Sequence, residues 1–396
     1  IMLTACGRAE DTATEENAGL QKVELVVWGA EEDAELMNQI IQSFQAEYQG
    51  QADFQISFEV QGESQCKDVL LGGLEDGADV FTFADDQLNA LAAAGALDPI
   101  ENADEIRNRN LSSTVEAATV NNRLYAYPLT ADNGYFLYYN KRYITEEQVK
   151  TLDGILEAAA SSGKLFTMDW SSAWYVYSFF GNTGLQIGLN DDGITNYCTW
   201  NQTDGDIRGV DVAQAMLRIA ENPGFANCTD EAFLNGVKDG SVIAGISGVW
   251  NAVAVKDAWG ENAGAVKLPT YTCKGSQVQM ASFSGCKLIG VNAYSEYPEW
   301  ASRLADWITD EENQRLRFAM RGQGPSNIVV AGSEEISQSP AIAALLEQSE
   351  FSQLQRVGGK FWDPVSKFAE NMAAGNPSGK NLQEQLDEMV EAVSER

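Results

Sequence analysis

The first hundred residues alternate between short apolar strands and amphipathic helices, and this order constrains the fold more than any other feature of the chain. Residues 23–28 form a β-branched apolar run that predicts a buried strand, and the apolar residues of 36–48 recur at helical spacing. Strict alternation over 54–60 predicts a second strand, and 79–83 predicts a third. Strands joined by helices in this order predict an α/β fold with a mainly parallel sheet.

A second series of strands and helices follows beyond residue 130. Segment 135–140 predicts a strand, an aromatic-rich region covers 170–180, and Gly-punctuated strands are expected around 242–246. Residues 300–318 predict one long helix with Trp300 and Trp307 on its core stripe. A chain of 396 residues is long enough for two or three domains, and we interpret this one as two α/β lobes.

Composition excludes several function classes. The chain has 26 basic and 58 acidic residues and a net charge of −32, so its surface repels phosphate and a nucleic-acid partner is not expected. It contains 0 histidines, which excludes catalytic triads, Cys-His dyads and imidazole bases. It also lacks the Gly-rich nucleotide-binding motifs. Carboxylate, lysine or serine chemistry remains, or binding without chemistry.

Residues 3–7 resemble a bacterial lipobox, the motif in which a signal peptidase cuts before a cysteine that then receives lipid. The following residues are acidic or small and have almost no large apolar side chains, so 1–21 are expected to be a lipobox and solvated tether. The sequence therefore predicts lipidation at Cys6. It places the protein on the extracellular face of the bacterial cytoplasmic membrane, held by lipid alone.

Five further cysteines are present: Cys66, Cys198, Cys228, Cys273 and Cys286. In an exported protein this number suggests up to two disulfides and one free thiol. Cys273 could pair with Cys286 and Cys198 with Cys228, although sequence alone does not decide the pairing. The Asp- and Gly-rich loops at 190–193 and 204–206 are interpreted as turns, because each lacks the glutamate that closes a calcium-binding loop. We expect neither a metal nor a cofactor.

Eight short segments, taken in order, resemble the extracellular solute-binding proteins of ABC importers, specifically the maltose-binding-protein-like sugar-binding family. They span almost the whole chain from residue 22 and lie at 23–28, 76–80, 94–100, 121–128, 137–141, 232–236, 247–250 and 289–293. The resemblance implies a two-lobed clamshell, each lobe a mainly parallel sheet flanked by helices, with three crossovers near 131–134, 283–287 and 326–332. Lobe one would be 22–131 plus 287–328, and lobe two 133–284 plus 333–396. Ligand would lie in a cleft that closes about a hinge.

A neutral oligosaccharide presents apolar C–H faces, which flat aromatic rings bind, and hydroxyl groups, which carboxylates bind through strong hydrogen bonds. The resemblance places six aromatic residues at or beside the cleft: Phe83, Trp170, Trp174, Tyr175, Trp250 and Trp362. Phe83 stands where the family has a stacking tryptophan.

The resemblance also supplies the acids. Asp86 and Asp132 match acidic cleft positions, and Glu31 or Glu32 takes the place of another sugar-binding acid. Ser172 occupies a position where the family has a carboxylate, so maltose itself is not carried over directly.

The sequence thus predicts a non-enzymatic, monomeric binding protein that captures an oligosaccharide and delivers it to the permease subunits of an ABC importer. Malto-oligosaccharides and other α-glucans are the first candidates, and other oligosaccharides are the alternative. A rival class is a cell-surface glycoside hydrolase with two carboxylates about 5–9.5 Å apart. Aromatic and acidic residues would serve either class, so hydrolysis of an oligosaccharide would distinguish them.

Overall fold

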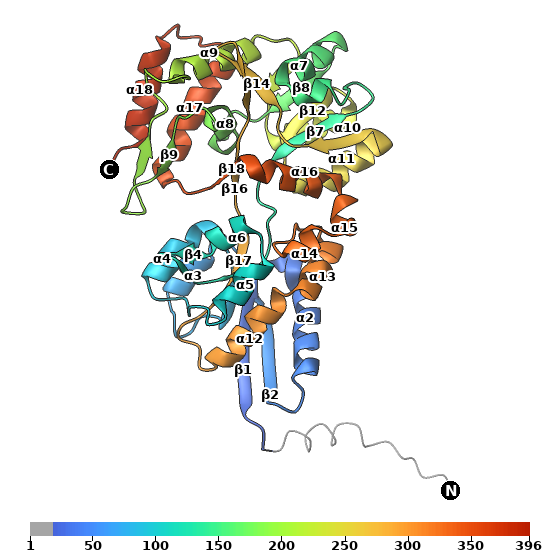
Figure 1. Ribbon diagram of the computed structural model, residues 1–396, viewed down its shortest axis with the longest axis vertical. Coiled ribbons are helices and arrows are strands. Elements are labelled where there is room, and N and C mark those ends of the chain that lie inside the picture. Colours follow the sequence, from blue (N-terminus) through green and yellow to red (C-terminus); the bar gives the residue numbers. More distant parts are fainter. Residues whose placement is uncertain (1–18) are drawn as a thin grey trace. The chain divides into compact units, whose positions relative to one another are not determined.

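The computed structural model describes residues 19–396 and divides the chain into two compact units (Figure 1). The first unit contains the chain up to Ala131 together with Cys286–Gly332, and the second contains Asp132–Gly285 and Ser333–Arg396. Each unit is therefore assembled from separated segments, and the chain passes from one unit to the other after Ala131, after Gly285 and after Gly332.

The first unit is built on a five-stranded sheet in the order β2-β1-β3-β17-β6. Its strands are β1 (Lys22–Gly29), β2 (Asp53–Val60), β3 (Val80–Ala84), β17 (Lys287–Val291) and β6 (Tyr127–Pro128). β1 is parallel to β2 and β3, whereas β17 is antiparallel to β3 and β6. The carboxyl ends of β1, β2 and β3 and the amino end of β17 therefore meet at one edge of the sheet.

Among its described residues, the first unit also contains eight α-helices, and Figure 1 shows α2 alongside β1 and β2. They are α2 (Ala34–Glu47), α3 (Cys66–Leu71), α4 (Leu88–Ala93), α5 (Ala103–Arg109), α6 (Ser112–Ala117), α12 (Pro298–Ile308), α13 (Glu311–Arg321) and α14 (Ile328–Ala331), with β4 (Thr119–Val120) and β5 (Arg123–Leu124) as a small hairpin. The predicted apolar stripe of α2 faces the core, where Phe44 packs edge-on against Trp300 and Trp307.

The single long helix predicted over 300–318 is instead two helices, α12 and α13. α12 ends at Ile308, and the Asp310 carboxylate accepts a hydrogen bond from the amide of Asn313 at the start of α13. An aspartate in this role is a strong N-terminal cap, so it starts a new helix where the apolar periodicity alone would continue the old one.

The second unit has its own five-stranded sheet in the order β11-β8-β12-β7-β13. These strands are β11 (Phe225–Asn227), β8 (Leu165–Met168), β12 (Val242–Ser247), β7 (Phe136–Asn140) and β13 (Ala263–Val266). β8 is parallel to β11 and β12, and β7 is antiparallel to β12 and β13. Smaller pairs are formed by β9 (Ile187–Leu189) with β10 (Asn196–Cys198), β14 (Thr270–Cys273) with β15 (Ser276–Gln279), and β16 (Ser282–Ser284) with β18 (Ser352–Leu354).

The helices of the second unit enclose an aromatic core, and α17 packs against both α8 and α18 (Figure 1). They are α7 (Leu152–Ser161), α8 (Ala173–Phe180), α9 (Gly209–Ala220), α10 (Asp230–Asp239), α11 (Ala252–Trp259), α15 (Glu334–Ser337), α16 (Pro340–Gln348), α17 (Trp362–Ala373) and α18 (Leu382–Val393). Within this core the Phe180 and Trp200 rings stack with centroids 4.0 Å apart. The predicted α/β class is confirmed, with antiparallel strands joining the parallel ones in each sheet.

The predicted disulfides are wrong, because all five cysteines of the described residues are free thiols. Cys273 pairs with Ser276 in the β14–β15 hairpin of the second unit, whereas Cys286 belongs to the first unit, where its amide donates to Asp85. Burial raises the pKa of Cys198 to about 12. Cys6 lies outside the described residues. Within residues 19–396, no helix is both long and apolar enough to cross a membrane.

Candidate functional site

Three of the predicted acids lie at one edge of the first sheet. Glu31 and Glu32 stand in the single-turn helix η1 (Glu31–Asp33) that follows β1, and Asp86 stands in η2 (Asp85–Gln87) after β3. All three side chains are exposed. Because β1 and β3 are parallel neighbours, their carboxyl ends place these turns side by side. This edge can therefore present several carboxylate acceptors to a ligand that carries hydroxyl groups.

Glu63 is a fourth acid at this edge, and the sequence analysis missed it. It follows β2, and its Oε2 lies 3.1 Å from Lys287 Nζ. Its Oε1 is buried and has no hydrogen-bond partner among the described residues. Burial raises the pKa of Glu63, and the nearby Lys287 ammonium opposes that rise. Its place after a parallel strand, like that of Glu31, is the signal that could have identified it.

Two predicted aromatic residues are core residues instead. Phe83 is fully buried, as are Val80 and Phe81 of the same strand, and its ring packs against Phe81. Trp170 is also fully buried and packs against Phe179 and Phe225. Neither ring has a free face for a ligand, so the expectation that these two residues contact sugar is corrected.

The second unit brings two other predicted residues together. The rings of Trp174 and Trp250 lie with centroids 5.9 Å apart and planes inclined by 34°. Trp250 is 49% exposed, which is unusual for so large an apolar side chain. Tyr175 is buried beside Trp174, and the Tyr135 hydroxyl donates to the Trp174 carbonyl at 2.7 Å. These contacts support a pair of aromatic rings, one of which is widely exposed.

Asp230 accepts hydrogen bonds from Trp250 and from two neighbouring side chains, and the sequence analysis did not identify it. Its Oδ2 accepts from Trp250 Nε1 and from Asn251 Nδ2, both at 2.9 Å, and its Oδ1 accepts from Ser247 Oγ at 2.5 Å. Asp230 begins α10, behind the N-cap Thr229. An acid in the first turn of a helix is ordinarily a dipole-stabilising residue, so no sequence signal separated this one from the others.

Trp362 and Asp132 complete the set of predicted residues. Trp362 is partly buried at the start of α17, 5.1 Å from the Phe361 ring and 6.5 Å from the Phe283 ring between centroids. Its helix is tied to the first turn of α8 by a hydrogen bond from the Ala173 amide to Ser366 Oγ. Asp132 is only 8% exposed and opens the second unit directly after Ala131.

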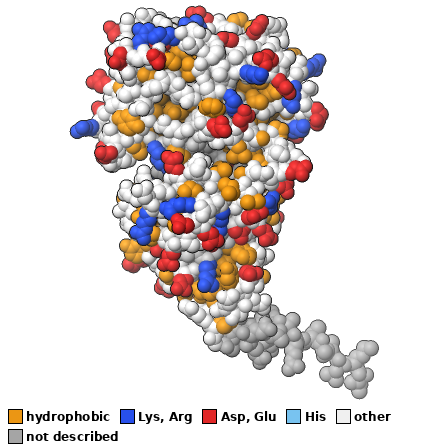
Figure 2. Space-filling view, in the orientation of Figure 1, with side chains coloured by type: hydrophobic (Ala, Val, Ile, Leu, Met, Phe, Trp, Pro, Cys, Tyr) orange, Lys and Arg blue, Asp and Glu red, His pale blue; other side chains and the backbone are white. Residues whose placement is uncertain are grey.

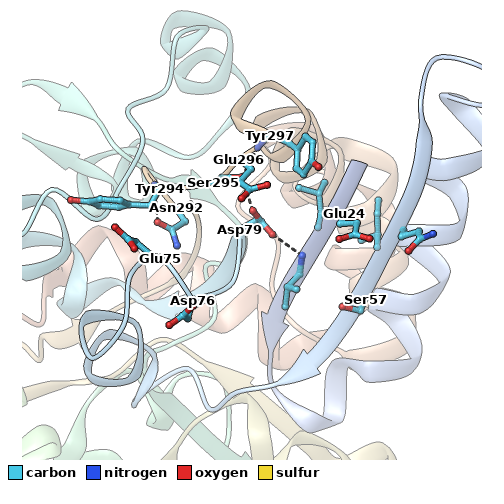
Figure 3. A pocket seen from close by; sticks show the side chains of 15 residues that line it. Glu24, Ser57, Glu75, Asp76, Asp79, Asn292, Tyr294, Ser295, Glu296 and Tyr297 are labelled. Atoms are coloured by element: carbon cyan, nitrogen blue, oxygen red, sulfur yellow. Dashed lines mark hydrogen bonds between the residues drawn. The ribbon is translucent and has the colours of Figure 1, made fainter. Parts of the chain in front are cut away.

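A cavity of about 590 Å³ lies elsewhere in the first unit. Figure 3 shows Glu75 and Asp76 on one side of Asp79 and Glu24 on the other. Asp79 directly precedes β3, so this cavity is at the sheet edge away from Glu31 and Asp86. The Asp79 carboxylate accepts hydrogen bonds from the Val26 amide and from Ser295 Oγ, so Asp79 has a structural role. None of the predicted site residues lines the cavity.

The charged side chains on one face of the molecule are dispersed. Figure 2 shows acidic and basic side chains scattered over the visible face, without a large basic patch. Across residues 19–396, no group of three or more Cys, Asp or Glu side chains is arranged to hold a metal ion. In the loop at 190–193, the Asp192 carboxylate accepts from the amides of Ile194 and Thr195, as expected for a turn.

The sequence model of the family described as "Bacterial extracellular solute-binding protein" matches residues 39–344. The chain belongs to this family. The resemblance noted from short sequence segments is thereby confirmed. The galactooligosaccharide-binding protein of Bacillus subtilis (strain 168) is 26% identical over 405 residues, covering 98% of this chain and 93% of the relative. The maltotriose-binding protein of Pyrococcus abyssi is 26% identical, and the alignment covers 80% of this solute-binding protein and 70% of the relative.

Solved structures agree on the fold. A maltodextrin-binding protein of L. casei BL23, without ligand, superposes with a TM-score of 0.83 at 23% identity and covers 95% of this chain and 100% of its own. A cyclo/maltodextrin-binding protein complexed with maltotetraose gives a TM-score of 0.76 at 21% identity, covering 94% and 96%. The solute-binding protein therefore has the maltose-binding-protein-like fold predicted from its sequence.

Proposed function

We propose that this solute-binding protein binds a neutral oligosaccharide without altering it and delivers it to the permease subunits of an ABC importer. The observation that carries the proposal is the exposed Trp250 ring, paired with Trp174 and fixed to Asp230. A large aromatic ring held at the surface is suited to the flat C–H face of a pyranose. The two curated relatives are named for oligosaccharides, which supports the same class of ligand.

The carboxylates at the edge of the first sheet are the proposed partners of the sugar hydroxyls. Glu31, Glu32 and Asp86 are exposed and share that edge, and an ionised oxygen accepts a stronger hydrogen bond than a neutral one. Asp132 and Trp362 are retained as proposed ligand residues.

Two sugars compete as the ligand. Malto-oligosaccharides are our first candidate, because the aromatic positions match those of the maltose-binding-protein-like family and one relative is named for maltotriose. Galactooligosaccharides are the second candidate, because the relative named for them aligns with 98% of this chain. The two differ in the linkage and in the C4 hydroxyl.

A glycoside hydrolase is the rival reading of the same residues. Hydrolysis needs one carboxyl that donates a proton and a second that acts as nucleophile or base. Burial raises the pKa of Glu63. Among the described carboxyl groups of this edge, it is therefore the candidate for the proton donor. The names of the relatives describe binding rather than cleavage, so we propose that the sugar leaves intact.

Isothermal titration of residues 19–396 tests both points. The chain is titrated with maltose, maltotriose, longer malto-oligosaccharides and β-galactooligosaccharides, and each sample is then analysed by chromatography. We expect one-to-one binding of one series and recovery of intact sugar. Shortened products would identify a hydrolase, and the absence of heat with every neutral oligosaccharide would refute the proposed ligand class.

The lipid anchor is proposed separately. Cys6 in its lipobox-like segment would carry lipid, and 1–21 would tether the protein to the extracellular face of the cytoplasmic membrane. Expression of the full precursor with an alkyne fatty acid tests this. We expect label on the wild type and none on Cys6→Ser, with the variant released into the medium. Equal labelling of the two would refute the anchor.

A further inference from the structure

We propose that Asp230 and Gly248 are positioning residues that hold the Trp250 ring in one orientation, so that the ring meets sugar already ordered. This inference rests on the proposed function, since it concerns how the aromatic platform is built. It goes further by assigning a role to two residues that do not themselves contact ligand.

The first half of the device is the Asp230 carboxylate. Both of its oxygens accept hydrogen bonds from the protein: Oδ1 from Ser247 Oγ, and Oδ2 from Trp250 Nε1 and Asn251 Nδ2. Asn251 Nδ2 also donates to Ser247 Oγ at 2.9 Å, which closes the network. Because all these donors belong to the chain, the carboxylate ties the indole to the neighbouring Ser247 and Asn251 side chains.

The second half is the absence of a side chain at Gly248. The Trp250 ring folds back over this glycine, and a Cβ built there would lie 2.0–2.5 Å from three carbons of the ring. Such a distance is far inside van der Waals contact, so any larger residue must displace the indole. The Gly248 carbonyl is held in turn by the Tyr138 hydroxyl, which donates to it at 2.7 Å.

These contacts matter because the ring is otherwise loosely held. Trp250 is 49% exposed and lies in the single-turn helix η4 (Val249–Asn251), so packing alone does not fix its orientation. An unrestrained indole would lose conformational freedom when it stacks on a sugar, and that loss would weaken binding. The hydrogen bond from the indole N–H to Asp230 and the contact of the ring with Gly248 fix the orientation of the ring before ligand binds.

The test combines a measurement that needs no ligand with one that does. Asp230→Asn keeps the shape of the side chain but replaces one acceptor oxygen by an NH₂ group that faces the donors of the network. In ¹⁵N-labelled residues 19–396, the indole N–H signal of Trp250, assigned by its loss in Trp250→Phe, should shift and exchange faster with solvent. Glu231→Gln removes a charge from the same helix turn at an exposed position and should leave the signal unchanged.

The second measurement is a double-mutant cycle on the dissociation constant of the tightest sugar in the panel. We expect Asp230→Asn to weaken binding about three- to tenfold in the wild type, which corresponds to the cost of ordering one side chain. The same change should have almost no further effect in Trp250→Ala, because the residue acts only through the ring. Additive losses in the two backgrounds would overturn the inference.

Gly248→Ala provides an independent variant in the same assay. It should weaken binding by a similar factor and broaden or shift the same indole signal, while Gly73→Ala, where a Cβ meets no atom within 4 Å, should change neither. If no sugar binds, the proposed ligand class fails, yet the indole signal still tests the positioning. An indole signal unmoved by both Asp230→Asn and Gly248→Ala would refute the positioning even where sugar binds tightly.

Discussion

Arg317 Nη1 lies 2.6 Å from Asp33 Oδ2, and each of the two side chains is 2% exposed. Arg321 Nε reaches the other oxygen, Oδ1, at 2.7 Å, and Gln323 Oε1 accepts from Arg317 at 2.9 Å. Asp33 closes the turn that carries Glu31 and Glu32. The turn that carries the exposed Glu31 and Glu32 is therefore anchored by the buried Asp33 carboxylate, which is paired with two guanidinium groups.

Removing this carboxylate should destabilise the first unit strongly. Asp33→Ala leaves the Arg317 charge buried without its partner, and breaking a buried pair in this way costs about 3–5 kcal/mol. Urea unfolding followed by circular dichroism measures the effect. Glu35→Ala, an exposed acid in the same helix region, is the control and should change the unfolding free energy by less than about 0.5 kcal/mol. A similar small loss for Asp33→Ala would contradict the pairing.

The same residue predicts how stability depends on pH. Burial favours the neutral form of Asp33, but Arg317 and Arg321 outweigh it, so the pKa of Asp33 lies below its usual value. A group with a lowered pKa in the folded state stabilises the protein above its ordinary pKa and loses this contribution as pH falls through the folded value. The stability difference between wild type and Asp33→Asn should therefore be constant near neutrality and shrink below about pH 4. A constant difference down to pH 2 would be inconsistent with this shift.

Truncating the two aromatic rings proposed to bind ligand should weaken sugar binding. Trp250→Ala and Trp362→Ala are each expected to cost about 1–3 kcal/mol of binding free energy, because they remove ring area from the proposed platform. Calorimetric titration measures this loss. Tyr294→Ala is a matched control, since Tyr294 is 51% exposed but lines the cavity at the other edge of the first sheet. Equal losses at all three positions would mean that the ligand site has been misplaced.

The free thiols give a prediction that needs no ligand. Cys66 and Cys273 are buried, and burial raises the pKa of Cys66 to about 12, so their thiolate forms are rare. Purified residues 19–396 should react slowly with Ellman's reagent when folded and expose all 5 thiols after denaturation. Dithiothreitol should not change the melting temperature. A drop in melting temperature on reduction would reveal a disulfide that this structure does not contain.

Much of the fold was predictable because its signals are local. The β1 strand, the apolar stripe of α2 and the alternation in β2 all appear in consecutive residues, and each element formed as expected. The break between α12 and α13 was missed because one capping aspartate, Asp310, outweighs a continuous apolar pattern.

The candidate site was less predictable because it depends on burial and on distant partners. Nothing local distinguishes the enclosed rings of Phe83 and Trp170 from the exposed ring of Trp250. Asp230 is 20 residues from Trp250 in the sequence, so their hydrogen bond appears only once α10 and β12 are placed. The expected Cys273–Cys286 pair failed for the same reason, since residue spacing does not report that these two cysteines belong to different units.

The position of β17 sets an order for folding. β3 and β6 both lie in the amino-terminal segment, yet β17 (Lys287–Val291), which lies between them in the sheet, is synthesised much later. All five strands of the second sheet lie between Phe136 and Val266, so they leave the ribosome earlier. The first sheet thus begins before the second sheet and is completed after it, and the edge of β3 that β17 covers is open to misassociation until β17 has been synthesised.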